Sequence, residues 1–98
     1  MNELESLSAL FQTLADVNRL RIIAFLEKEE RSVNEVVKTL KLSQPLVSHH
    51  LKVLKQISLV QTTRKGPFVL YRLSDDRITA GINRFLEIRR ALWESKNG

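Results

Sequence analysis

The stretch SQPLVSHHLKVLK, residues 43–55, gives the strongest indication of the fold. Ser43 is a good N-cap for a helix, and Pro45 suits the first turn, where a missing backbone N–H costs nothing. Stepped at about 100° per residue, the stretch separates into an apolar half and a polar half. The polar half carries amide, hydroxyl, imidazole and ammonium groups on Gln44, Ser48, His49, Lys52, Lys55 and Gln56, and it also includes Pro45. The sequence therefore predicts an amphipathic helix with no carboxylate on its outer face.

The absence of acidic side chains extends well beyond this helix. Residues 38–72 hold seven Lys and Arg and no Asp or Glu, whereas residues 1–37 hold four bases and seven acids. A solvated surface normally mixes both signs. The bias therefore favours a polyanionic partner, although a solvated basic face is the simpler explanation for one helix taken alone.

Three helices are predicted before this stretch. Leucines at helical spacing indicate a first helix to about residue 14, and Asp16 can cap a second. The buried side of the second helix would hold Leu20, Ile23, Ala24, Phe25 and Leu26. Ser32 and Glu35 have the spacing of a capping box for a short third helix that ends near Leu40.

The pattern becomes β-type after the fourth helix. The runs VQTTR and FVLYRL are separated by residues 65–67, Lys-Gly-Pro, which predicts a hairpin over residues 59–73 with Gly66 in the turn. A last helix over residues 75–94 opens at Asp75 or Asp76. The predicted chain is one domain, residues 1–98, mainly α with a small β-hairpin in the order α-α-α-α-β-β-α.

A helix-turn-helix over residues 32–57 followed by a basic hairpin is a winged-helix layout. Gln, Ser and Lys side chains can bond base edges or phosphates, and a helix N-terminus favours a phosphate. We therefore expect contacts with double-stranded DNA from Ser43, Gln44, Pro45, Ser48, His49, Lys52, Lys55, Arg64 and Lys65. An ordinary turn with exposed bases explains the wing alone equally well.

Both terminal helices, over residues 1–14 and 75–94, carry spare apolar surface. We expect them to form a homodimer interface through Leu4, Leu7, Phe11, Ile78, Ile82, Phe85, Leu86, Leu92 and Trp93. A core within the subunit and a pocket wall are the alternatives. Arg89 lies among these apolar residues of the last helix. Its stem could pack on them with the charged head in water, or its head could contact an anion or form a salt bridge between subunits.

Several polar residues have structural explanations. His50 falls within the apolar half of its helix, so we expect a buried imidazole with hydrogen-bond partners rather than a ligand. We expect Arg19 and Arg21 to form structural ion pairs with the acidic first third of the chain. Asp75 and Asp76 suit charges at a helix N-terminus better than calcium ligands.

The segments LADVNRLRIIAFL, SVNEVVKTLKLSQPLVSHHLKVLKQISLV and RKGPFVLYRLS, in this order, resemble the ArsR/SmtB family of bacterial and archaeal winged-helix repressors. The resemblance covers roughly residues 7–74. It implies a homodimer that binds a palindromic operator and blocks transcription, usually until a metal or another signal releases it. Matching positions imply a recognition helix over residues 44–56 and a wing over residues 64–67.

The usual sensing chemistry of that family is missing. The chain has no cysteine, and the family's metal-binding places in the third helix hold Ser32, Asn34 and Val37. On the last helix Asp76 matches, but the family's histidine places hold Ile78, Arg89 and Leu92. Without soft ligands we expect no transition-metal site, and the effector stays unidentified.

Other function classes find little support in the sequence. A Gly-rich phosphate loop and a nucleophile–base grouping are both absent, so we expect neither an enzyme nor a cofactor. No apolar run is long enough to span a membrane, and acids near the N-terminus argue against a secretory signal, so we expect a cytoplasmic protein. Two alternatives remain: a sensor for a small organic ligand or partner protein at the terminal helices, and a protein-interaction module without DNA binding.

Overall fold

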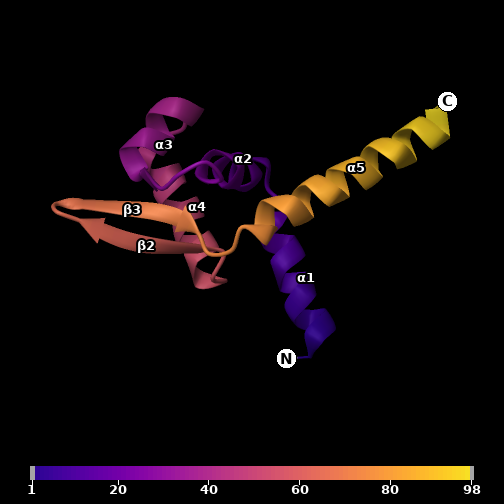
Figure 1. Ribbon diagram of the computed structural model, residues 1–98, viewed down its shortest axis with the longest axis horizontal. Helices are drawn as coiled ribbons and strands as arrows, with labels where there is room; N and C mark the ends of the chain where they lie inside the picture. Colours follow the sequence, from indigo (N-terminus) through magenta and orange to yellow (C-terminus); the bar gives the residue numbers. More distant parts are fainter. Residues whose placement is uncertain (1, 98) are drawn as a thin grey trace.

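The computed structural model describes residues 2–97, which form five helices and a small antiparallel sheet (Figure 1). The helices are α1 (Glu3–Leu14), α2 (Val17–Leu26), α3 (Val33–Leu40), α4 (Gln44–Gln56) and α5 (Arg77–Asn97). The strands are β1 (Arg31–Ser32), β2 (Val60–Lys65) and β3 (Phe68–Leu73). The predicted order of helices and hairpin is confirmed, and β1 is an addition to it.

The sheet has the order β1-β3-β2, so the wing is joined to the helical part by a third strand. Ser32 pairs with Leu70 in this sheet, and its hydroxyl also accepts a hydrogen bond from the backbone N–H of Glu35. The capping box over these residues is confirmed. The sequence predicted the cap but not the strand, because two residues are too few to show an alternating pattern.

Short polar side chains begin the helices as expected. Asp16 accepts hydrogen bonds from the first turn of α2, and Ser43 accepts one from the N–H of Leu46 in α4. Asp75 accepts a bond of 2.8 Å from the N–H of Arg77, so α5 begins two residues later than predicted. It also continues past residue 94, to Asn97.

The turn before α4 and the turn of the hairpin both contain a residue in the left-handed backbone conformation. Lys41 has a φ of 57° and ends α3, which leaves residues 41–43 as the turn before α4. Gly66 has a φ of 60° in the loop between β2 and β3. That conformation suits the first position of a tight hairpin turn and favours glycine there.

The core lies where α2, α3, α4 and the base of the hairpin meet. Its buried members are Ile22, Ile23, Leu26, Val36, Val47, Leu51, Leu54, Leu59 and Val60. The prediction for α2 was partly wrong, because Ala24 is exposed while Ile22 is fully buried. Consecutive apolar residues in this helix left its buried face ambiguous in the sequence, and packing against α1, α3, α4 and β3 selects the Ile22 side.

The molecule is more extended than a globular chain of its length. Its radius of gyration is 15.0 Å, whereas about 13 Å is usual for 100 residues. The hairpin projects from one side of the body, and α1 and α5 project from the other (Figure 1). Every residue of α5 from 83 to 96 is exposed. Along the described residues, no helix is both long and apolar enough to cross a bilayer.

Candidate nucleic-acid interface

The outer face of α4 is fully available to a partner. Val47, His50, Leu51 and Leu54 are buried, and this inner half anchors the helix on the core. The first turn contains no acidic side chain. The structure exposes all nine predicted DNA contacts, namely Ser43, Gln44, Pro45, Ser48, His49, Lys52, Lys55, Arg64 and Lys65. DNA contact by these residues stays a prediction.

The wing places cations and an aromatic ring at its tip. Lys65 and Phe68 face each other across the end of the hairpin, and Arg64 precedes them. Phe68 is 62% exposed. The apolar pattern of its strand does not distinguish Phe68 from a core residue, so the sequence alone predicts no contact for it. The loop of Gly66 and Pro67 joins the two strands at this end of the wing.

The sequence around the wing contains no acidic residue, but the structure brings a carboxylate from elsewhere in the chain to it. The ammonium group of Lys65 donates to Oε1 of Glu30, which immediately precedes β1. Lys55, at the end of α4, donates to the hydroxyl of Thr62 at 3.4 Å. Lys65 is therefore held beside a carboxylate, whereas no acidic side chain lies within 4.0 Å of Arg64 among the described residues.

The predicted buried histidine is confirmed, with His50 only 4% exposed. Nη1 of Arg19 lies 3.2 Å from its Nδ1, and Oδ1 of Asp16 lies 3.8 Å from its Nε2. Arginine has only donors, so Nδ1 must accept and the ring proton is on Nε2. Burial lowers the pKa of His50, Asp16 opposes that shift, and Arg19 and His49 add to it.

The ion pairs predicted for Arg19 and Arg21 were wrong. Arg19 donates through Nε to the carbonyl of Thr13 at 2.6 Å, and Arg21 donates through Nη2 to the carbonyl of Leu40 at 2.8 Å. Neither guanidinium forms a salt bridge within the described chain. Both residues are structural as expected, but they link elements through backbone carbonyls, which sequence spacing does not reveal.

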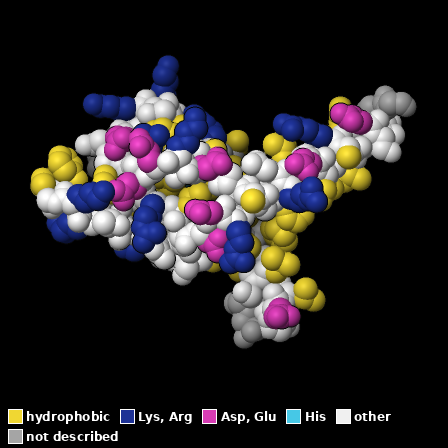
Figure 2. All heavy atoms as spheres, viewed as in Figure 1, with side chains coloured by type: hydrophobic (Ala, Val, Ile, Leu, Met, Phe, Trp, Pro, Cys, Tyr) yellow, Lys and Arg dark blue, Asp and Glu magenta, His cyan; other side chains and the backbone are white. Residues whose placement is uncertain are grey.

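The apolar surface predicted as a dimer interface is largely uncovered. Its exposed members are Leu4, Leu7, Phe11, Phe85, Leu86, Leu92 and Trp93. Ile78 and Ile82 differ, because they are half-buried and pack against the core of their own chain. Figure 2 shows hydrophobic side chains gathered inside the angle between α1 and α5. This exposed set is called the terminal-helix surface below.

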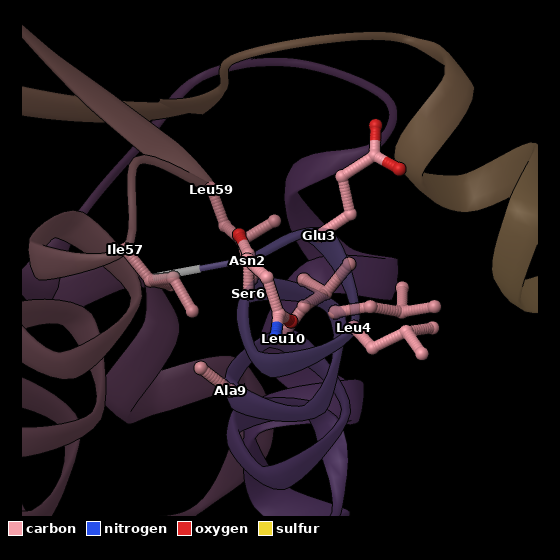
Figure 3. Close-up of a pocket in the computed structure, with 9 residues that line it drawn as sticks. Asn2, Glu3, Leu4, Ser6, Ala9, Leu10, Ile57 and Leu59 are labelled. Carbon is pink, nitrogen blue, oxygen red and sulfur yellow. The ribbon is translucent and has the colours of Figure 1, made fainter.

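Two grooves lie along the terminal-helix surface. Figure 3 shows one between the first half of α1, which contributes Leu4 and Leu10 to its lining, and the segment that follows α4, which contributes Ile57 and Leu59. A second lies between α1 and α5, with Phe11, Phe85 and the stem of Arg89 in its lining. The guanidinium of Arg89 lies 5.4 Å from the centre of the Trp93 ring, a contact that neither sequence hypothesis for Arg89 included.

The acidic residues at the start of α5 were the other candidates for a binding site. Asp75 is the predicted charge at the start of α5, and its hydrogen bonds with Arg77 lower its pKa to about 2. Residues 2–97 contain no group of three or more His, Cys, Asp or Glu side chains arranged to hold a metal ion.

Comparison with known proteins gives consistent matches. Residues 16–62 match the profile described as "Bacterial regulatory protein, arsR family". The chain is 41% identical to the transcriptional repressor SmtB of Mycobacterium tuberculosis over 76% of this chain and 56% of that protein. It is 32% identical to an SmtB homologue described as a transcriptional repressor from Synechocystis, over 97% of this chain and 70% of that protein. The chain thus spans little more than half of the mycobacterial relative.

A solved structure matches at the level of the fold. It is a homodimeric winged helix-turn-helix DNA-binding domain from Mycobacterium bovis, with a TM-score of 0.82 and 23% identity. The match covers 94% of this chain and 85% of that one. The arrangement of α3, α4 and the hairpin is therefore a winged helix-turn-helix.

Proposed function

This chain belongs to the arsR family of bacterial regulatory proteins, and we propose that it is a sequence-specific DNA-binding transcriptional regulator that represses as a homodimer. One observation carries the proposal. The outer face of α4 exposes amides, a hydroxyl and cations, within a 35-residue stretch, 38–72, that holds seven bases and no acid. A carboxylate there would repel a phosphate backbone.

In the proposed complex, α4 lies in the major groove. Gln44, Ser48, His49 and Lys52 would face base edges or phosphates, since these are the groups that read or position a duplex. The wing would reach the neighbouring backbone with Arg64. The N-terminus of α4 would favour a phosphate, because its first turn presents a positive dipole end and no acidic side chain.

The dimer would form through the terminal-helix surface. A second copy is the occupant that fits best, because α5 projects from the body with exposed apolar side chains along its length. A helix that its own core does not support is marginal in water. A two-fold axis through this surface would present two copies of α4 to half-sites about 34 Å apart.

The relatives that match this chain are described as regulators, and we assign the protein no catalytic role and no cofactor. A regulator of prokaryotic operators acts in the cytoplasm, so we place the protein there. The effector, if one is bound, stays unassigned.

Selection of bound sites from random duplexes at two salt concentrations tests the proposal. We expect enrichment of a palindrome whose half-sites lie about one helical turn apart, with weaker recovery at the higher salt. Absence of enrichment, or binding that is indifferent to salt, would overturn DNA recognition and leave a protein-interaction module. A thermal-shift screen with metabolites would then identify a ligand of the terminal helices.

A further inference from the structure

A short hydrogen-bonded chain connects the first helix to the recognition helix. It runs from the carbonyl of Thr13 near the end of α1, through the guanidinium of Arg19 in α2, to the imidazole of His50 in α4. We propose that Arg19 and His50 are positioning residues that fix α4 relative to the dimer helix α1 and so set the distance between the two recognition helices. This inference rests on the function proposed above.

Arg19 suits such a link because its guanidinium is planar and directs several donors at fixed angles. Nε donates to Thr13 at 2.6 Å, and Nη1 donates to His50 at 3.2 Å. The backbone N–H of Arg19 also donates to Oδ1 of Asp16 at 3.0 Å. One half-buried side chain therefore touches α1 and α4 while its own backbone is held in the first turn of α2.

His50 completes the link from the side of α4. It occupies an inner position beside Val47, Leu51 and Leu54, where an aliphatic side chain would pack without polar cost. A buried polar group stabilises a fold only where it has a partner. Nδ1 of His50 has a hydrogen bond from Arg19, whereas the carboxylate of Asp16, at 3.8 Å from Nε2, is an electrostatic contact longer than a hydrogen bond. The polar contact adds direction to the apolar packing, because it is satisfied in one orientation of α4.

His50 lies beside the predicted DNA contacts, so the orientation of α4 that it fixes also sets their positions. It directly follows His49 and lies two residues from both Ser48 and Lys52 on α4. A change in the angle between α1 and α4 would therefore move these side chains together. Because a two-fold axis repeats any such change in the partner subunit, the separation of the two recognition helices would change by twice as much.

Protonation would break the link. A second N–H at Nδ1 would point at the guanidinium of Arg19 and could no longer accept its hydrogen bond. The charged groups that face the ring are Asp16 and Arg19 from the start of α2, with the ring of His49 at 5.6 Å on its own helix. The working state of His50 is thus the neutral imidazole.

The test compares two substitutions that break the link with two matched controls. His50→Leu removes the acceptor but keeps apolar bulk, and Arg19→Lys cannot reach both partners at once. His50→Asn keeps an acceptor near the position of Nδ1. Arg21→Lys makes the same change two residues away, at an arginine that bonds Asn18 and the carbonyl of Leu40 instead.

Each variant is titrated against three kinds of duplex: the selected operator, operators with spacing changed by one base pair, and a single half-site. We expect His50→Leu and Arg19→Lys to lose on the order of tenfold on the operator, to lose its spacing preference, and to bind the half-site within about twofold of the parent. His50→Asn should recover most of the loss, and Arg21→Lys should match the parent.

Equal losses on operator and half-site, no loss at all, or failure of His50→Asn to recover binding would each overturn the inference. A parent protein that selects no duplex would overturn the proposed function instead. Long-range ¹H–¹⁵N spectra of the parent give a readout independent of DNA and of variant folding. We expect the His50 proton on Nε2 at neutral pH, and a proton on Nδ1 would contradict the link.

Discussion

Phe11 of α1 and Phe85 of α5 meet edge to face, with ring centroids 5.4 Å apart and ring planes at 88°. Aromatic pairs favour this geometry and gain about 0.5–1.5 kcal/mol from it beyond burial. The two rings nevertheless stay 41% and 58% exposed. The contact therefore joins the two terminal helices into one continuous apolar surface and leaves that surface uncovered.

Leu92→Glu is expected to weaken self-association. Leu92 is 63% exposed in the single chain, so a glutamate there is solvated in the monomer but buried without a partner in the proposed dimer. We expect the dimer dissociation constant to rise by at least about tenfold. Ala91→Glu adds the same charge at the preceding residue. Because Ala91 lies on the side of α5 that faces away from the apolar surface, this variant should associate like the parent. Sedimentation of both variants that matches the parent would argue against this surface.

Gln44→Ala is expected to change which sequence is preferred. A glutamine in the first turn of a recognition helix can bond adenine with both ends of its amide, and its loss should cost about 1–3 kcal/mol at one base pair. Competition with duplexes carrying every single-base change in the half-site measures the effect. A uniform loss at all positions would mean that Gln44 contacts the backbone instead.

Lys65 and Glu30 give a paired prediction for the wing. Lys65→Ala removes a cation from the tip and should weaken binding to all sequences alike, with a smaller salt slope. Glu30→Gln removes the carboxylate that holds the ammonium group, so it should strengthen binding to all sequences. If Glu30→Gln weakens binding, the ion pair instead holds the wing in its binding position.

His50 is expected to make the free energy of unfolding depend on pH. Burial lowers its pKa below the ordinary value of 6.5, so the unfolded chain binds the proton more readily. The stability from the neutral ring is therefore fully present above 6.5 and is lost as pH falls through the lower pKa of the folded state. Asp16, whose pKa is lowered below 3.8 chiefly by the N–H of Arg19, loses its contribution only in more acidic solution.

Urea unfolding across the range from about pH 7.5 to 5 measures this effect. We expect His50→Asn, which does not titrate there, to flatten the fall in stability. His49→Asn is the matched control, because His49 is exposed on the same helix and its replacement leaves the buried ring of His50 in place, so most of the fall should remain. A fall of equal size in all three proteins would assign it to other groups.

Local patterns predicted the parts of the site that one element determines. The polar and apolar halves of α4, its cap at Ser43 and the turn at Gly66 follow from spacing within a few residues. The links that tie elements together did not follow. Arg19 and His50 are 31 residues apart, and Glu30 and Lys65 are 35 apart. The first contact depends on how α2 packs against α4 and the second on how β1 joins the sheet, and periodicity encodes neither.

The dependence of DNA affinity on salt measures how many phosphates α4 and the wing neutralise. Each phosphate neutralised should contribute about −0.9 to the slope of log K against log salt. With exposed cations on α4 and the wing of each subunit, we predict a slope steeper than about −3 for the selected operator. A slope near zero, or no measurable binding to duplexes in dilute buffer, would contradict the account.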